Sequence, residues 1–540
     1  MGRRVAGRAL AQGITSSLRP NEQLRVLAGH RGELPVLRDL LQPLLPVGAE
    51  LWLGCGLGSE QLKQLGCLHL PDPGLAHWCQ LRAGLPPSSF SITGVTHTLC
   101  SKAVVQGLEA LVTAPLECWD ALICTSTAAK EVAERAISRQ LEVLERRFGQ
   151  QLMQPAGPQL PIIPLAIDPE SFQDSSQGLD RSRRRQLARQ RLGINTDDYV
   201  VLFLGRLSFH SKAHPLPLYK ALATLSQSAP VLLLECGHLF NAAIETAYND
   251  LAAQFPTLRV KRLGGQTPAT EDEKILALWA ADVFCSPADN LQETFGLSLL
   301  EAMAAELPII ASDWNGYRDL VDHGVTGLLI PTSDQLKGQT LTDELERQYR
   351  IGLVDYDSMI YQRSQCVVVD HQALETALKH LHDQPEQRQK MGSAGQDRLQ
   401  RKFSWTSVAQ QYRRLWEELN DLRQAATQAS QKAWPTSDYG SLFGHYSTHI
   451  ASTTSFRTTT HNTSPEFLLK PMQQGVINRW CNQSSCHRLV QLLLDWRDRQ
   501  DIISEETWHQ AANALGIQPD HQRALLIALE KLGVIEGMKA

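Results

Sequence analysis

Glu293 and Glu301 bound the segment ETFGLSLLE, which follows the apolar strand pattern ADVFCSP and opens an apolar helical pattern. Glu293 is therefore expected just before a helix and Glu301 about one turn inside it. Small residues around Gly296 allow backbone N–H groups to approach an anion, and a helix N-terminus carries partial positive charge. Two carboxylates in these places can accept hydrogen bonds from different hydroxyl groups of one extended ligand. The segment indicates a site for a phosphate-bearing ligand.

The same two glutamates also fit a plainer interpretation, with Glu301 on a helix surface and Glu293 capping the helix N-terminus. The segment FLGRLSFHSKAHP adds Arg206 at the end of an apolar strand pattern and Lys212 six residues later. Cations at the rim of a parallel sheet can neutralise a diphosphate. Their presence favours ligand binding over capping alone.

The composition limits which protein classes fit. The chain has 540 residues, of which 43% are hydrophobic and 20% charged, with a formal net charge of -5. Such a chain can form large cores, and its charge disfavours nucleic acid as a partner. The arginine-rich segment RSRRRQLARQRLGI at 181–194 is interpreted as the solvated face of a short helix.

The 11 cysteines are scattered, and several lie in apolar strand patterns, as Cys124 and Cys285 do. This usage is typical of free thiols in a reducing compartment. Cys481, Cys486 and His487 form a C-x4-C-H cluster without a second Cys/His pair to complete a zinc site, so no metal site is predicted. With neither a signal-peptide pattern nor an apolar run of about 18 residues, a cytoplasmic protein is expected, free or peripherally attached to a membrane.

Buried strand patterns alternate with amphipathic helical patterns twice along the chain, which predicts two parallel sheets covered on both faces. The fold class expected is α/β, with two Rossmann-like, doubly wound domains facing a cleft. A segment rich in Ser, Thr, Gly and His then suggests a linker before renewed helical patterning. The predicted parts are an N-terminal domain at 1–195, a second domain at 196–402, a helix crossing back onto the first domain at 403–423, a linker at 424–464 and a helical tail of unknown role at 465–540.

Roughly residues 1–420 resemble the retaining glycosyltransferases of GT-B fold, specifically glycosyltransferase family 4, most strongly at 199–331. The E-x7-E motif of that family matches ETFGLSLLEAMA, and its basic pair matches GRLSFHSK. PIIPLAID resembles the segment leading to the interdomain hinge, FSWTSVAQQYRRLW the closing helix, and SITGVTHTL the acceptor-side histidine segment. The departures are Glu306 and Ala166, where glycine is usual, and the start MGRRVAGRALAQGI, which resembles the family's first loop and helix without the preceding strand.

The resemblance implies roles for individual residues. Glu293 would contact the donor sugar and Glu301 the nucleoside ribose, while Arg206 and Lys212 would bind the diphosphate. His97 would contact the transferred sugar, although a core or surface histidine fits its segment nearly as well. The remaining contacts would come from the backbone amides of Phe295, Gly296 and Leu297.

The implied activity is transfer of a sugar from a nucleotide sugar to a glycan, lipid or small-molecule acceptor with retention of configuration. No metal or other cofactor is expected, because the basic pair can take the cation's role and no convincing DxD-type signature is present. Two alternatives stay open: a nucleotide-sugar epimerase or sugar phosphorylase on the same fold, and a catalytically silent binding or scaffold protein. The sequence identifies neither the donor's base and sugar nor the acceptor.

Overall fold

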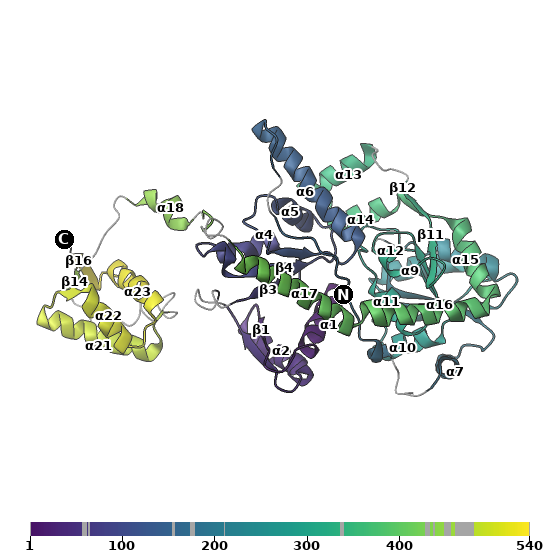
Figure 1. The fold of residues 1–540 in the computed structure, drawn as a ribbon, viewed down its shortest axis with the longest axis horizontal. Helices are drawn as coiled ribbons and strands as arrows, with labels where there is room; N and C mark the ends of the chain where they lie inside the picture. The colour runs from purple at the N-terminus through teal and green to yellow at the C-terminus, as the bar shows by residue number, and fades with distance from the viewer. Residues whose placement is uncertain are drawn as a thin grey trace. The chain divides into compact units, whose positions relative to one another are not determined.

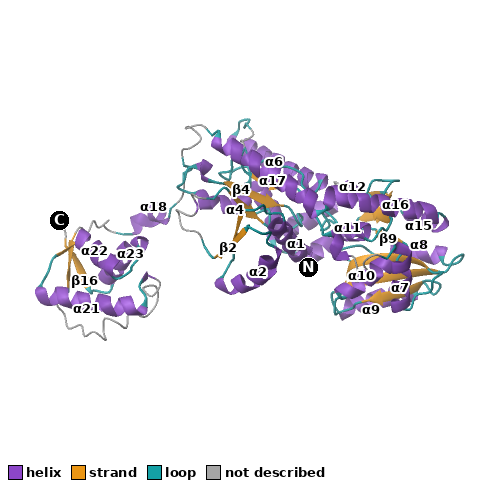
Figure 2. Ribbon diagram, turned by 60° about the horizontal axis from the view of Figure 1, so that its bottom comes forward, coloured by secondary structure: helices purple, strands orange, loops and turns teal. Residues whose placement is uncertain are grey.

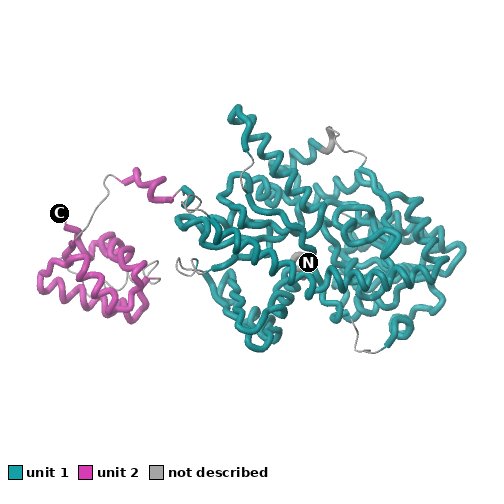
Figure 3. Tube along the Cα trace, viewed as in Figure 1, with its two compact units in different colours: residues 1–435 teal, residues 436–540 magenta. Residues whose placement is uncertain are grey.

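The chain forms two compact units, residues 1–435 and 436–540 (Figure 3). The computed structural model describes residues 2–56, 62, 65–153, 157–172, 179–209, 211–334, 340–426, 433–435, 438–447, 455–459 and 480–538. None of the helices in these ranges is both long and apolar enough to cross a membrane.

A six-stranded parallel sheet with strand order β11-β10-β9-β6-β7-β8 forms the centre of the second Rossmann-like domain (Figures 1 and 2). Alternate residues of β6 enter two different cores: Val200 and Leu202 pack with α10 and α11, and Val201 and Phe203 pack with α8 and α15. Burial on both faces explains why its strands are nearly continuous apolar runs. The strands are β6 (Tyr199–Leu207), β7 (Val231–Leu239), β8 (Arg259–Leu263), β9 (Val283–Ser286), β10 (Ile309–Ser312) and β11 (Gly327–Ile330).

Helices cover this sheet on both faces, as the doubly wound prediction requires. They are α8 (Leu216–Leu225), α9 (Ala242–Ala253), α10 (Glu271–Ala280), α11 (Leu297–Ala304), α12 (Tyr317–Leu320), α15 (His371–Asp383) and α16 (Pro385–Arg398). A short antiparallel pair, β12 (Thr332–Asp334) and β13 (Val367–Val369), flanks the helices α13 (Thr340–Ile351) and α14 (Tyr356–Ser364).

The first domain is also α/β, but its parallel strands form two small sheets in the described residues. One pairs β1 (Gln23–Leu27) with β2 (Glu50–Gly54), and the other has the order β3-β4-β5. Neither β1 nor β3 was singled out from the sequence, and the segment PIIPLAID contributes only isolated bridges, such as Cys124 to Ile162. The other elements are α1 (Gly2–Ser16), α2 (Leu34–Leu41), β3 (Cys67–Leu70), α4 (Leu75–Trp78), β4 (Ser91–Val95), α5 (Lys102–Ala110), β5 (Ala121–Ile123) and α6 (Thr127–Phe148).

Helix α17 (Trp405–Gln424) returns from the second domain to pack on the first. Arg413 on this helix donates to both carboxylate oxygens of Glu22, at 2.5 and 3.1 Å. The indole Nε1 of Trp416 donates to Thr93 Oγ1 at 3.4 Å. Through these contacts α17 packs against the first domain.

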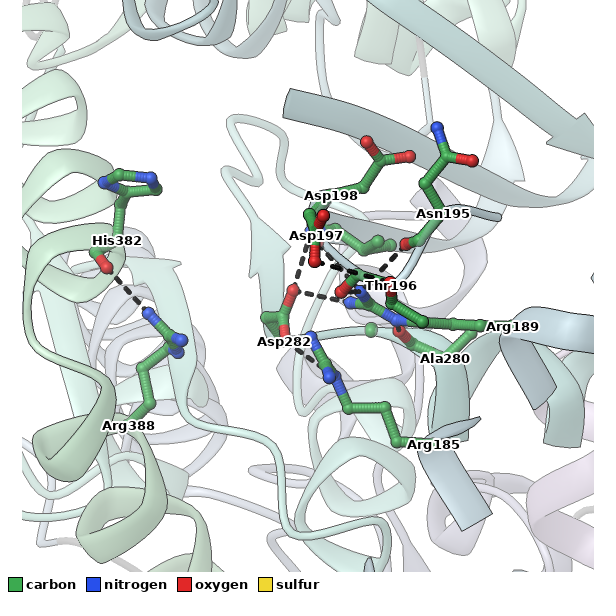
Figure 4. A network of polar contacts seen from close by, with 12 residues as sticks. Arg185, Arg189, Asn195, Thr196, Asp197, Asp198, Ala280, Asp282, His382 and Arg388 are labelled. Carbon is green, nitrogen blue, oxygen red and sulfur yellow. Dashed lines mark hydrogen bonds and ion pairs between the residues drawn. The ribbon is translucent and has the colours of Figure 1, made fainter. Parts of the chain in front are cut away.

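The arginine-rich helix α7 (Arg181–Leu192) is not simply a solvated face, and that interpretation is wrong for Arg189 (Figure 4). Arg189 is 1% exposed and donates to the carbonyl oxygens of Ala280, Asn195, Thr196 and Asp198. Its guanidinium also pairs with Asp282 at 2.7 Å. Burial lowers the pKa of Arg189, with Asp282 opposing the shift. The helix pattern failed here because it does not show that Arg189 can bind carbonyl oxygens at the end of α10 and after α7 in the fold.

The second unit combines helices with an antiparallel sheet of order β15-β14-β16. Strand β14 (Ser455–Thr458) falls within the predicted linker, so that prediction is wrong for these residues, and the tail is not purely helical. Cys481 and Cys486 lie in the core of this unit, where the Cys486 thiol donates to the Cys481 carbonyl. The other elements are α18 (Tyr439–Phe443), α21 (Gln483–Arg499), β15 (Ile503–Ser504), α22 (Glu505–Ala514), α23 (Pro519–Lys531) and β16 (Ile535–Met538).

Candidate active site

A cavity of about 420 Å³ opens between the two Rossmann-like domains, at the carboxyl ends of β6, β7 and β9. Ligands of doubly wound folds bind at this edge because the loops after parallel strands meet there. The structure brings every predicted site residue to this one cavity: His97, Arg206, Lys212, Glu293, Phe295, Gly296, Leu297 and Glu301.

Lys212 and Glu293 form an ion pair at the wall of the cavity, through Nζ and Oε2. Lys212 follows β6 and Glu293 follows β9, two strands paired in parallel, so their loops leave the sheet side by side. Burial raises the pKa of Glu293, but the Lys212 ammonium and the Phe295 and Thr294 amides outweigh it and hold the pKa below its ordinary value. Glu293 is therefore ionised at neutral pH, with its charge already balanced.

Glu301 is paired with a second lysine, which the sequence reasoning did not single out. Lys274 on α10 places its Nζ 3.3 Å from Glu301 Oε1 and 2.6 Å from Glu271 Oε2. Burial raises the pKa of Glu301, with Lys274 opposing the shift. The cation also lies over the Phe172 ring, 5.2 Å from its centroid. The signal available in the sequence was a lysine among acidic residues in EDEKILALWA, a pattern that also fits an exposed first helical turn.

The turn into α11 depends on Gly296, which precedes the helix with φ of 108°. A Cβ atom there would lie 2.4 Å from the ring of Tyr317 and would also adopt the left-handed region that favours glycine. The turn aims the N-terminus of α11 into the cavity, where its first N–H groups lack partners within the helix. Phe295, Gly296 and Leu297 line the cavity at this turn, and the Phe295 amide already acts on the Glu293 carboxylate.

Arg206 and His97 approach the cavity from opposite domains. Arg206 lies at the end of β6 and, among the described residues, pairs with no carboxylate, so its charge is available to an anionic ligand. His97 follows β4, and its ring Nε2 lies 3.1 Å from the carbonyl oxygen of Pro71, to which it donates. That bond orients the imidazole at the cavity edge.

The loop that carries Glu293 also holds the loop that carries Lys212. Asn290 donates from its side-chain amide to the Lys212 carbonyl at 2.5 Å. Asp289 Oδ2 accepts from the His214 amide at 3.1 Å, while its other carboxylate oxygen is buried without a hydrogen-bond partner among the described residues. Burial raises the pKa of Asp289 to about 7. Neither residue was singled out from the sequence, since a short polar turn after a strand is common.

Residues 184–347 match the family model described as glycosyl transferases group 1. The D-inositol 3-phosphate glycosyltransferase of Corynebacterium urealyticum is 32% identical over 184 residues, covering 32% of this chain and 41% of that protein. The one from Salinispora arenicola is 36% identical over 162 residues, covering 29% of this chain and 35% of that protein. The chain thus spans less than half the length of these curated relatives.

Among solved structures, Anabaena Alr3699/HepE in complex with UDP aligns with a TM-score of 0.50 and 15% identity, covering 76% of this chain and 96% of that chain. At this identity the likeness concerns the fold. The segment at 184–347 is therefore similar to the glycosyl transferases group 1, and the two facing Rossmann-like domains have the GT-B fold.

Proposed function

We propose that the protein transfers a sugar from a nucleoside diphosphate sugar to an acceptor hydroxyl with retention of configuration, as the glycosyltransferases of family 4 do. The observation that carries the proposal is the pair of glutamates in one cavity, each held by its own lysine: Glu293 by Lys212 and Glu301 by Lys274. A ligand that spans both would present its sugar to Glu293 and its ribose to Glu301.

The cations of the cavity supply what the bond cleavage needs. When the anomeric C–O bond breaks, its electron pair goes to the diphosphate, and negative charge develops there. Arg206, Lys212 and the N-terminus of α11 are already in place where that charge develops, so they stabilise the transition state more than the ground state. In this scheme the cationic side chains take the role of a metal ion.

The acceptor enters from the side of the first domain. Attack on the face from which the diphosphate leaves retains the anomeric configuration, and the acceptor's hydroxyl proton passes to the departing phosphate. His97 lies on that side and would contact the transferred sugar. The acceptor class is proposed as a glycan, lipid or small molecule with a free hydroxyl group.

The test is a panel of UDP-, GDP- and ADP-glucose with the full chain, in which release of nucleoside diphosphate and the thermal shift on binding are both measured. Wild-type protein should be stabilised by one member and turn it over. Arg206→Ala and Lys212→Ala should each slow turnover about 100-fold, as loss of one preorganised charged contact does. Arg135→Ala, on an exposed part of α6, is the matched control. No binding to any member, or full rates in both cavity variants, would overturn the proposal.

A further inference from the structure

Helices α13 and α14 of the second domain reach the first domain through two tyrosine hydroxyls. The Tyr349 hydroxyl accepts a hydrogen bond from the Lys102 amide at 2.8 Å. The Tyr356 hydroxyl lies 3.2 Å from Cys100 Sγ. Figure 1 shows α13 and α14 near the start of α5, although 247 residues separate Lys102 and Tyr349 in the chain. The helix pair therefore bridges the two domains at one edge of the cavity.

The contact with Lys102 satisfies a backbone donor that helix α5 leaves open. The first four N–H groups of a helix have no partner within it, and a side chain at the N-cap usually accepts from one of them. Ser101 occupies the N-cap of α5 but makes no such bond. The phenol of Tyr349 takes its place, so the start of α5 is fixed from the other domain.

The segment from Cys100 to Lys102, which the two tyrosines contact, continues a stretch of chain that lines the cavity. Thr96, His97 and Thr98 line the cavity, and Cys100 follows only two residues later. Tyr356 also feels a charge from the second domain. Burial raises the pKa of Tyr356, whereas the Arg206 guanidinium acts to lower it. Tyr356 thus contacts the continuation of the histidine loop and interacts electrostatically with the cation proposed to bind the diphosphate.

We infer that Tyr349 and Tyr356 are positioning residues that hold the loop 96–101 across the cavity and thereby set His97 over the reacting end of the donor. The inference rests on the proposed function for its catalytic consequence, but the positioning itself does not. Each hydroxyl makes one bond across the domain boundary, so removing one should loosen the loop without removing the donor site.

The experiment compares Tyr349→Phe and Tyr356→Phe with Tyr361→Phe, a control whose ring lies on α14 and is 46% exposed. Amide hydrogen exchange of residues 98–106 reports the loop directly and requires no substrate. Exchange should be faster by about 3- to 10-fold in Tyr349→Phe, as loss of one hydrogen bond implies, and also faster in Tyr356→Phe. The control should match the wild type.

Kinetics distinguish positioning from a merely structural role. With the member of the UDP-, GDP- and ADP-glucose panel that the wild type turns over fastest, kcat should fall about 3- to 10-fold in both variants. Affinity for the corresponding diphosphate should stay within about twofold, because Glu301 and Lys274 are untouched.

Wild-type exchange in both variants overturns the inference whether or not any sugar is transferred. Faster exchange with an unchanged kcat also overturns it, since the contacts would then serve packing alone. An inactive wild-type protein instead overturns the proposed function, and faster exchange in the same variants would still support the positioning of the loop.

Discussion

The ammonium group of Lys274 lies 3.3 Å from Oε1 of Glu301. This ion pair joins α11, which forms part of the cavity wall, to the first turn of α10. Burial raises the pKa of this glutamate. The lysine therefore determines how far Glu301 remains ionised, and an ionised carboxylate is the better acceptor for two ribose hydroxyls.

Lys274→Met should weaken binding of the nucleoside diphosphate about 10-fold at neutral pH, because the pKa of Glu301 then rises further and less of its carboxyl group is ionised. Raising the pH should restore part of the affinity, since deprotonation returns the charge. Titration calorimetry with UDP, GDP and ADP measures both effects. Lys379→Met, at an exposed pair on α15, is the control. Unchanged affinity at all pH values would contradict the assigned role.

Replacing each glutamate by glutamine should change a different quantity, the affinity for nucleotide in one case and kcat in the other. Glu301→Gln should lower affinity for free nucleoside diphosphate about 10-fold, because the ribose is present in that ligand. Glu293→Gln should leave this affinity within about twofold and lower kcat instead, because its proposed partner is the sugar. Calorimetry and a transfer assay separate the two. Equal loss of nucleotide affinity in both variants would refute the division of roles.

Asp289→Asn should make the protein more stable in alkaline solution. The folded-state pKa of Asp289 is about 7, above the ordinary 3.8, so ionisation opposes folding. In the wild type, the contribution of Asp289 to the free energy of unfolding is fully present below pH 4. It decreases as the pH rises toward 7. The shift of the pKa from 3.8 to about 7 changes the free energy of unfolding by at most about 4 kcal/mol.

Urea denaturation at pH 5 and pH 8 checks the prediction. The asparagine variant should exceed the wild type by about 1 to 3 kcal/mol at pH 8 and by less at pH 5, because its carbonyl oxygen can still accept from the His214 amide. A pH-independent difference between the two proteins would contradict the burial of an unpaired carboxylate oxygen.

Gly296→Ala should destabilise the second domain by about 2 to 4 kcal/mol, since the added Cβ meets Tyr317 in a left-handed backbone conformation. Gly107→Ala is a matched control inside α5, where a Cβ meets no atom within 4 Å. That change should stabilise by about 0.5 to 1 kcal/mol, as alanine does in a helix interior. Thermal denaturation of both variants gives the comparison, and equal effects would refute the turn geometry.

The elements with long, regular patterns were predictable. The apolar helical pattern opened by ETFGLSLLE coincides with α11, and the placement of Glu293 and Lys212 at one sheet edge follows from parallel strand ends. Lys274 was not predictable, because its pattern fits an exposed helix start and its partner lies 27 residues away in another helix. Arg189 was missed for a related reason: hydropathy alone does not show that nearby carbonyls require a donor.

Strand β14 was missed because four residues carry too little pattern, and its partners lie far along the chain. Ser455 pairs with Met538 and Thr458 with Ile535, so this strand closes the sheet from the opposite end of the second unit. In the described part of that unit, the first and last strands therefore pair in one ladder. Such a topology suits circular permutation of residues 455–538, since joining the start of β14 to the end of β16 and opening the exposed turn after α21, where Ile502 is 64% exposed, would leave the same strand pairs in place.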